Sequence, residues 1–104
     1  MSRPRNGEAA LRQEITLNIP YDLSDEEWEK VAAVYASLDG WLGGQDGPAW
    51  YGREGDARYI GSSVEPSGIQ FFGEVEAPLW TGWLTVLCAR MSLALEREVH
   101  DAEV

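Results

Sequence analysis

The sequence has few of the residues that build disulfides, metal sites and nucleic-acid surfaces. Its single cysteine, Cys88, cannot form an internal disulfide, which agrees with a reducing compartment. Its single histidine, His100, has no second histidine or thiolate pair to complete a zinc site. Eight basic against eighteen acidic side chains give a formal charge of −10, which repels phosphate backbones and anionic lipids. We therefore predict no metal, no cofactor and no nucleic-acid partner.

Long hydrophobic runs are also absent. The longest strongly apolar stretch, residues 84–89, is far shorter than the roughly 20 residues that cross a bilayer, and Arg90 ends it. Arg3 and Arg5 are not followed by the apolar segment of a secretory signal. We expect a cytoplasmic protein that does not insert into membranes.

The composition predicts one globular domain. The chain has 104 residues, of which 44% are hydrophobic and 25% are charged, and this is enough to bury one core. Residues 1–12 combine proline, glycine and scattered charge without periodicity, so we interpret them as a flexible leader. Residues 13–104 then form a single α+β domain.

The first periodic segments predict a strand and then a helix. Residues 14–19 alternate in polarity, as expected for a strand with one buried face. Ser24 and Glu27 have the spacing of a capping box, which predicts a helix that starts there and stops at Gly40. The apolar stripe of this helix comprises Trp28, Val31, Ala32, Tyr35 and Leu38.

The middle of the chain predicts a loop and a meander. Residues 40–48 hold four glycines and one proline, which favours an irregular loop. Residues 49–53 and 58–65 predict a hairpin, and residues 69–75 predict a third strand after a turn.

A second helix begins near Pro78, because proline fits the first helical turn. Its apolar stripe comprises Trp80, Trp83, Leu84, Leu87, Met91 and Leu95. Two interpretations of residues 98–103 stay open, a fraying helix end and a short terminal strand. The predicted fold class is therefore α+β, an antiparallel sheet of three to four strands with two helices on one face. The order is β-α-β-β-β-α, with a short C-terminal strand as the open alternative.

No catalytic motif is present. Cys88 has no nearby base that would activate it, Ser62 and Ser63 lack the glycines of a nucleophile elbow, and the glycine-rich loop lacks the lysine of a phosphate loop. We predict that the chain is not an enzyme.

The tryptophans are the most informative residues for binding. Two of the five, Trp41 and Trp50, fall outside the helical stripes and flank the glycine-rich loop. Tryptophan is enriched at interface hot spots, and Asp46, Glu54 and Asp56 would supply an acidic rim. We predict that these five residues contact a protein partner, with core packing of the two tryptophans as the alternative.

Two stretches carry a resemblance, DGWLGGQDGPAWYGREGD and SVEPSGIQFFGEVEAPLWTGW. They resemble small hypothetical bacterial proteins with no associated activity. In size, acidity and lack of catalytic groups the chain is similar to immunity proteins of bacterial toxin systems. That resemblance implies a small acidic inhibitor that caps a basic toxin, and it transfers no individual residue.

Three hypotheses follow. The first is a non-catalytic protein that binds a basic protein partner through the acidic loop face. The second is a small-molecule-binding domain or enzyme with a pocket lined by Tyr51, Tyr59 and Trp83. The third is a homodimer that pairs sheet edges or exposed parts of the second helix.

Overall fold

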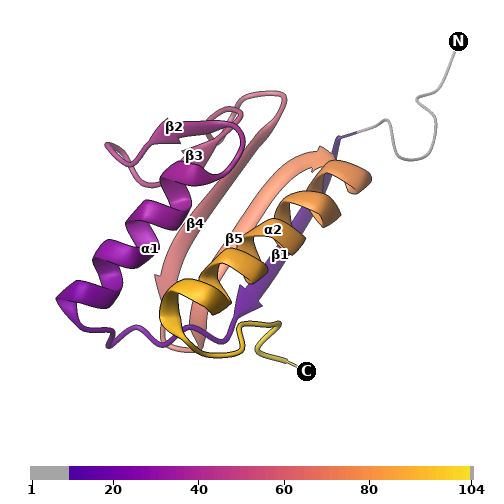
Figure 1. Cartoon of the computed structure of the whole chain (residues 1–104). Helices are drawn as coiled ribbons and strands as arrows, with labels where there is room; N and C mark the ends of the chain where they lie inside the picture. Colours follow the sequence, from indigo (N-terminus) through magenta and orange to yellow (C-terminus); the bar gives the residue numbers. More distant parts are fainter. Residues whose placement is uncertain (1–9, 104) are drawn as a thin grey trace, which may run out of the picture.

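The fold is given by a computed structural model that describes residues 10–103 (Figure 1). The leader predicted for residues 1–12 lies outside the described residues as far as position 9. Among the described residues, no helix is long and apolar enough to cross a membrane. The elements follow one another as β1 (Ala10–Leu17), α1 (Asp25–Ser37), β2 (Trp41–Gly43), β3 (Ala49–Trp50), β4 (Tyr59–Glu65), β5 (Gly68–Glu76) and α2 (Ala77–Leu95).

Within residues 10–103 the strands form one five-stranded antiparallel sheet in the order β1-β5-β4-β3-β2. Both helices cover the same face of the sheet (Figure 1), so the predicted α+β class is confirmed. The predicted number of three to four strands is too low. The additional strand is β2, which lies within the loop that the sequence predicts for residues 40–48. It is only three residues long and irregular in register, and therefore shows no polarity alternation that could predict it.

The first strand begins earlier than predicted. Residues 10–12 belong to the predicted leader, but in the structure they pair with residues 74–76 of β5. The long strand β5 supplies hydrogen-bond partners to a segment that has no hydrophobic pattern of its own. Tertiary pairing, and not local sequence, therefore fixes where β1 starts.

The start of α1 is as predicted. The Ser24 hydroxyl accepts a hydrogen bond from the Glu27 backbone N–H at 3.1 Å, and the Glu27 carboxylate accepts one from the Ser24 backbone N–H at 3.1 Å. The buried face of the helix differs slightly from the predicted stripe. Val34 is buried, whereas Ala32 is exposed beside the sheet.

The second helix begins with Pro78 in its first turn, as predicted. Its buried residues are Trp80, Trp83, Leu87, Met91 and Leu95. The segment after it forms one isolated bridge, between Leu17 and Asp101, and the backbone N–H of Ala102 donates to the Thr16 carbonyl at 2.8 Å. Residues 98–103 therefore cover one end of the β1 edge without becoming a strand.

The core between sheet and helices is rich in aromatic rings. Trp50 and Phe71 are fully buried, and the Trp50 ring meets the rings of Trp83 and Tyr35 edge to face at centroid distances of 4.8 and 5.0 Å. These contacts join α1, α2 and the sheet centre, so the aromatic cluster fixes the relative positions of the surfaces described next.

Candidate functional site

Trp50 does not contact solvent. Its exposed fraction is 0%, and its indole N–H donates to the Tyr35 carbonyl at 3.0 Å. The prediction that Trp50 contacts a partner is therefore wrong, and its alternative, core packing, describes the residue. The reason is its place in the sheet, where it pairs with Trp41 on one side and Ile60 on the other.

Trp41 is half-buried and packs against the same cluster, with ring centroids 5.3 Å from Trp50 and 6.3 Å from Tyr35. Its remaining surface lines a groove described below. It therefore keeps the accessibility that a binding role requires.

The three predicted acidic residues are exposed but are not equivalent. Asp46 and Glu54 line one shallow cavity of about 280 Å³, together with Tyr59 and Phe72. Phe72 follows the buried Phe71 along β5, so this cavity lies on the sheet face without helices. The Asp56 carboxylate accepts from the Arg53 backbone N–H at 2.8 Å and closes a turn. Only Asp46 and Glu54 are thus brought together.

A second hollow, the α1–β4 groove, has an apolar lining and a volume of about 390 Å³. Its walls come from α1, from the β2–β3 segment and from β4. Val64 is exposed by 51% at its rim and adds apolar surface there. The lining residues are Trp28, Val31, Ala32, Tyr35, Trp41, Gly44, Pro48, Ser62, Ser63 and Val64.

The edge of β4 next to this groove is open. The short strand β3 pairs with β4 only at Ile60 and Gly61. Among the described residues, positions 62–65 therefore have a strand partner on one side only, namely β5. An unpaired strand edge beside apolar surface can accept a further strand.

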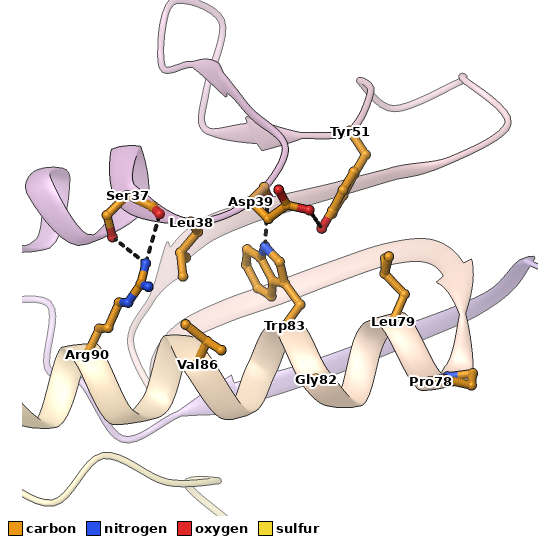
Figure 2. Close-up of a pocket in the computed structure, with 10 residues that line it drawn as sticks. All are labelled: Ser37, Leu38, Asp39, Tyr51, Pro78, Leu79, Gly82, Trp83, Val86 and Arg90. Atoms are coloured by element: carbon orange, nitrogen blue, oxygen red, sulfur yellow. Dashed lines mark hydrogen bonds between the residues drawn. The ribbon is translucent and has the colours of Figure 1, made fainter.

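A third hollow, the α1–α2 cleft, lies between the end of α1, Tyr51 and α2 and has a volume of about 490 Å³ (Figure 2). Polar groups stand at both ends of it. At one end the Tyr51 hydroxyl donates to the Asp39 carboxylate at 2.8 Å, and the Trp83 indole N–H donates to the Asp39 carbonyl at 3.3 Å. At the other end the Arg90 guanidinium donates from one nitrogen to the carbonyl and hydroxyl of Ser37, at 2.8 and 3.0 Å.

Tyr51 adopts a backbone conformation that is rare for its residue type, with φ of 68°. Its backbone N–H donates to the Gly40 carbonyl at 2.8 Å, and this bond holds the ring over the cleft (Figure 2). Burial, with the Asp39 carboxylate adding to it, raises the pKa of Tyr51 well above its ordinary value. The phenol therefore keeps its proton and continues to donate to Asp39. Strained backbone of this kind is concentrated at functional sites.

Gly82 forms part of the floor of the cleft. A Cβ added there would meet no atom within 4 Å, so packing does not require a glycine. Glycine inside a helix costs about 1 kcal/mol relative to alanine. No close contact of Gly82 offsets this cost. The missing side chain leaves the floor of the cleft open between Leu79 and Val86.

The pocket predicted from sequence corresponds only in part to this cleft. Tyr51 and Trp83 line it, but Tyr59 lies on the other sheet face against Phe72, with ring centroids 6.4 Å apart. Sequence reasoning missed Asp39, Gly82 and Arg90. The spacing of Trp83, Val86 and Arg90 along one helical face was a usable signal, whereas the approach of Asp39 depends on the tertiary fold.

The residues weighed for metal or nucleophilic chemistry gain no support. Among residues 10–103, no group of three or more His, Cys, Asp or Glu side chains could hold a metal ion. Burial raises the pKa of the Cys88 thiol, which lowers its nucleophilic fraction at neutral pH. The backbone N–H of His100 donates to the Asn18 side chain at 2.8 Å, so this residue anchors the segment after α2.

Tyr35 gives the fold a measurable dependence on alkaline pH. Its burial raises the pKa from 10.0 to about 12, so the unfolded chain loses this proton first. The stability that the neutral phenol contributes is complete below pH 10.0 and is lost as pH rises through about 12. The loss should amount to roughly 2 to 3 kcal/mol in the free energy of unfolding. Urea unfolding at several pH values should show this fall, with less of it in Tyr35→Phe and all of it in Tyr21→Phe, where the ring is exposed.

Comparison of the chain with protein-family models, with curated proteins and with solved structures finds no match in any of the three.

Proposed function

We propose that this chain is a non-catalytic binding protein that accepts an extended, basic segment of a partner protein in the α1–β4 groove. The observation that carries the proposal is the open edge of β4 at residues 62–65, next to an apolar groove. A segment that pairs with this edge extends the sheet by one strand.

Hydrogen bonding and packing both favour an extended occupant. The backbone N–H and C=O groups on an open edge bind another strand without regard to its sequence. Alternate side chains of the added strand would point under α1, toward Trp28, Ala32 and Tyr35. This arrangement selects a segment in which every second residue is apolar.

Charge favours a basic occupant. The ten residues that line the groove are all uncharged, so a preference for charge must come from residues around it. Asp25 and Glu29 are exposed on α1, three positions before and one position after Trp28, so acidic side chains lie on the helix that forms one wall. With a formal charge of −10, the chain should attract basic segments at a rate that falls as salt rises.

The partner class that we propose is a basic toxin, as the resemblance to immunity proteins implies. An inhibitor of this kind needs no catalytic group, and it would act in the cytoplasm of the cell that it protects. Of the five residues predicted to contact the partner, Trp41 keeps a role in this proposal as part of the groove wall, whereas Asp46 lines the cavity on the other sheet face.

Two exposed alanines of α1 provide a matched test. Ala32 lines the groove, whereas Ala36, one turn later, is exposed and does not line it. The probe is a short peptide of alternating lysine and valine, titrated while backbone amide signals are recorded by NMR. We expect Ala32→Lys to weaken binding by about tenfold or more and Ala36→Lys to change it by about twofold at most.

The same titration tests the chemistry of the occupant. A peptide of alternating glutamate and valine should leave the amide signals of residues 62–65 unchanged. Equal effects of Ala32→Lys and Ala36→Lys, or shifts that avoid β4 and α1, would contradict the proposal. A partner captured from a native lysate at low salt supports it only if Ala32→Lys no longer retains that partner.

A further inference from the structure

The α1–α2 cleft offers opposite charges at its two ends. Asp39 uses one carboxylate oxygen to accept from Tyr51, and Arg90 uses one guanidinium nitrogen to donate to Ser37. Both residues are among those described, and they make no ion pair with each other. One carboxylate oxygen and the remaining guanidinium donors are left for a ligand.

The distance between the two ends follows from α2. Trp83 donates to Asp39 at one end and Arg90 donates to Ser37 at the other. Seven residues of helix separate Trp83 from Arg90, which is about 10 Å along the helix axis. An ion pair at each end takes up about 3 Å, which leaves about 4 to 5 Å between the ammonium and the carboxylate of the ligand. A single amino acid carries both groups on one carbon and is too short, whereas the termini of a dipeptide are separated by about this length.

The floor between the charged ends is apolar and open. Leu79 and Val86 flank Gly82, which has no side chain, and the Trp83 ring rises from α2 to Asp39 (Figure 2). A ligand side chain placed over Gly82 would contact Leu79 and Val86. This surface favours an apolar side chain.

We infer that the α1–α2 cleft binds a small zwitterion of dipeptide length. The ammonium group of the ligand pairs with the Asp39 carboxylate, its carboxylate pairs with the Arg90 guanidinium, and an apolar side chain covers Gly82. The hydrogen bond from Tyr51 fixes the Asp39 carboxylate in place before the ligand arrives, which reduces the ordering needed on binding. This site is separate from the α1–β4 groove and does not depend on the proposed function.

The test uses alanyl-leucine as probe and the indole N–H signal of Trp83 as reporter, because this group donates to the Asp39 carbonyl inside the cleft. We expect saturable shifts of this signal with alanyl-leucine. N-acetyl-alanyl-leucine lacks the ammonium group and alanyl-leucine amide lacks the carboxylate, so each should bind about tenfold or more weakly.

Protein variants assign the two charges. Asp39→Asn keeps an acceptor for the Tyr51 hydroxyl. It should weaken the binding of alanyl-leucine and remove the preference of the cleft for alanyl-leucine over its acetylated form. Arg90→Gln should remove the preference over the amide. Gly82→Phe should abolish binding by filling the floor, while Thr81→Phe, on an exposed neighbouring position outside the cleft, should leave it unchanged.

Two results would contradict binding of a dipeptide in the α1–α2 cleft. No shift of the Trp83 signal at millimolar alanyl-leucine, or equal binding of the free and blocked dipeptides, would overturn the inference. The backbone amide spectrum of each variant reports folding independently of binding. Ala32→Lys, which tests the groove, should bind alanyl-leucine as the unmodified chain does, so failure of one proposal can be told from failure of the other.

Discussion

Trp50→Ala should lower the free energy of unfolding by about 3 to 5 kcal/mol, the range for removing a buried tryptophan. The side chain is fully buried and its indole N–H donates to the Tyr35 carbonyl. Its removal leaves a cavity among Tyr35, Phe71 and Trp83 and an acceptor without its donor. A domain of this size is stable by about 5 to 15 kcal/mol, so the variant should lose a large part of its stability.

Urea unfolding followed by circular dichroism measures this loss. Leu42→Ala is the matched control, because Leu42 lies in the neighbouring strand β2 but is exposed by 52%. It should change the free energy of unfolding by about 0.5 kcal/mol at most. A similar loss in both variants would mean that Trp50 is not the centre of the core.

Gly68→Ala should be at least as damaging as the removal of an ordinary core side chain, with a loss of about 3 kcal/mol or more. Gly68 begins β5 with φ of +145°, where side chains are disfavoured. An added Cβ would also overlap the Leu17 carbonyl oxygen, and this atom belongs to the backbone of β1 and cannot move aside easily. The substitution would therefore force β1 and β5 apart.

Gly55→Ala separates the two causes. Gly55 has φ of +103°, but a Cβ added there would meet no atom within 4 Å. Gly55→Ala should lower the free energy of unfolding only by the cost of placing a side chain on a left-handed backbone, about 1 to 2 kcal/mol. If the two alanine variants lose equal stability in thermal unfolding, the close approach of β1 to Gly68 does not limit the fold.

Local signals in the sequence predicted what local interactions determine. The Ser24 and Glu27 capping box and the position of Pro78 depend on a few neighbouring residues, and both helices start where these residues predicted. The hairpin of β4 and β5 follows from its turn and its alternation. The start of β1 and the existence of β2 depend on strands far away in the sequence, so periodicity could not reveal them.

In the candidate sites, too, the sequence predicted what neighbouring residues determine and did not predict what the tertiary fold determines. Trp41 and Trp50 looked equivalent in the sequence because both flank a glycine-rich loop, yet only Trp50 pairs on both sides within the sheet. The acidic residues were placed correctly at the surface, because charge alone predicts exposure. The open edge of β4 results from the shortness of β3, and the cleft results from the approach of residues 37–39 to α2. Neither has a signature in the local pattern.

The pairing of β1 with β5 also has a consequence for folding during synthesis. Ile15 pairs with Phe71, so the first strand has no partner until more than half of the chain has been made. At about 5 to 20 residues per second, the ribosome leaves β1 unpaired for roughly 3 to 11 seconds. The Thr16 carbonyl on the other edge of β1 stays without its partner for longer, because the backbone N–H that donates to it belongs to Ala102. A nascent chain held before residue 69 should therefore recruit chaperones to β1, and release should follow once β5 has emerged.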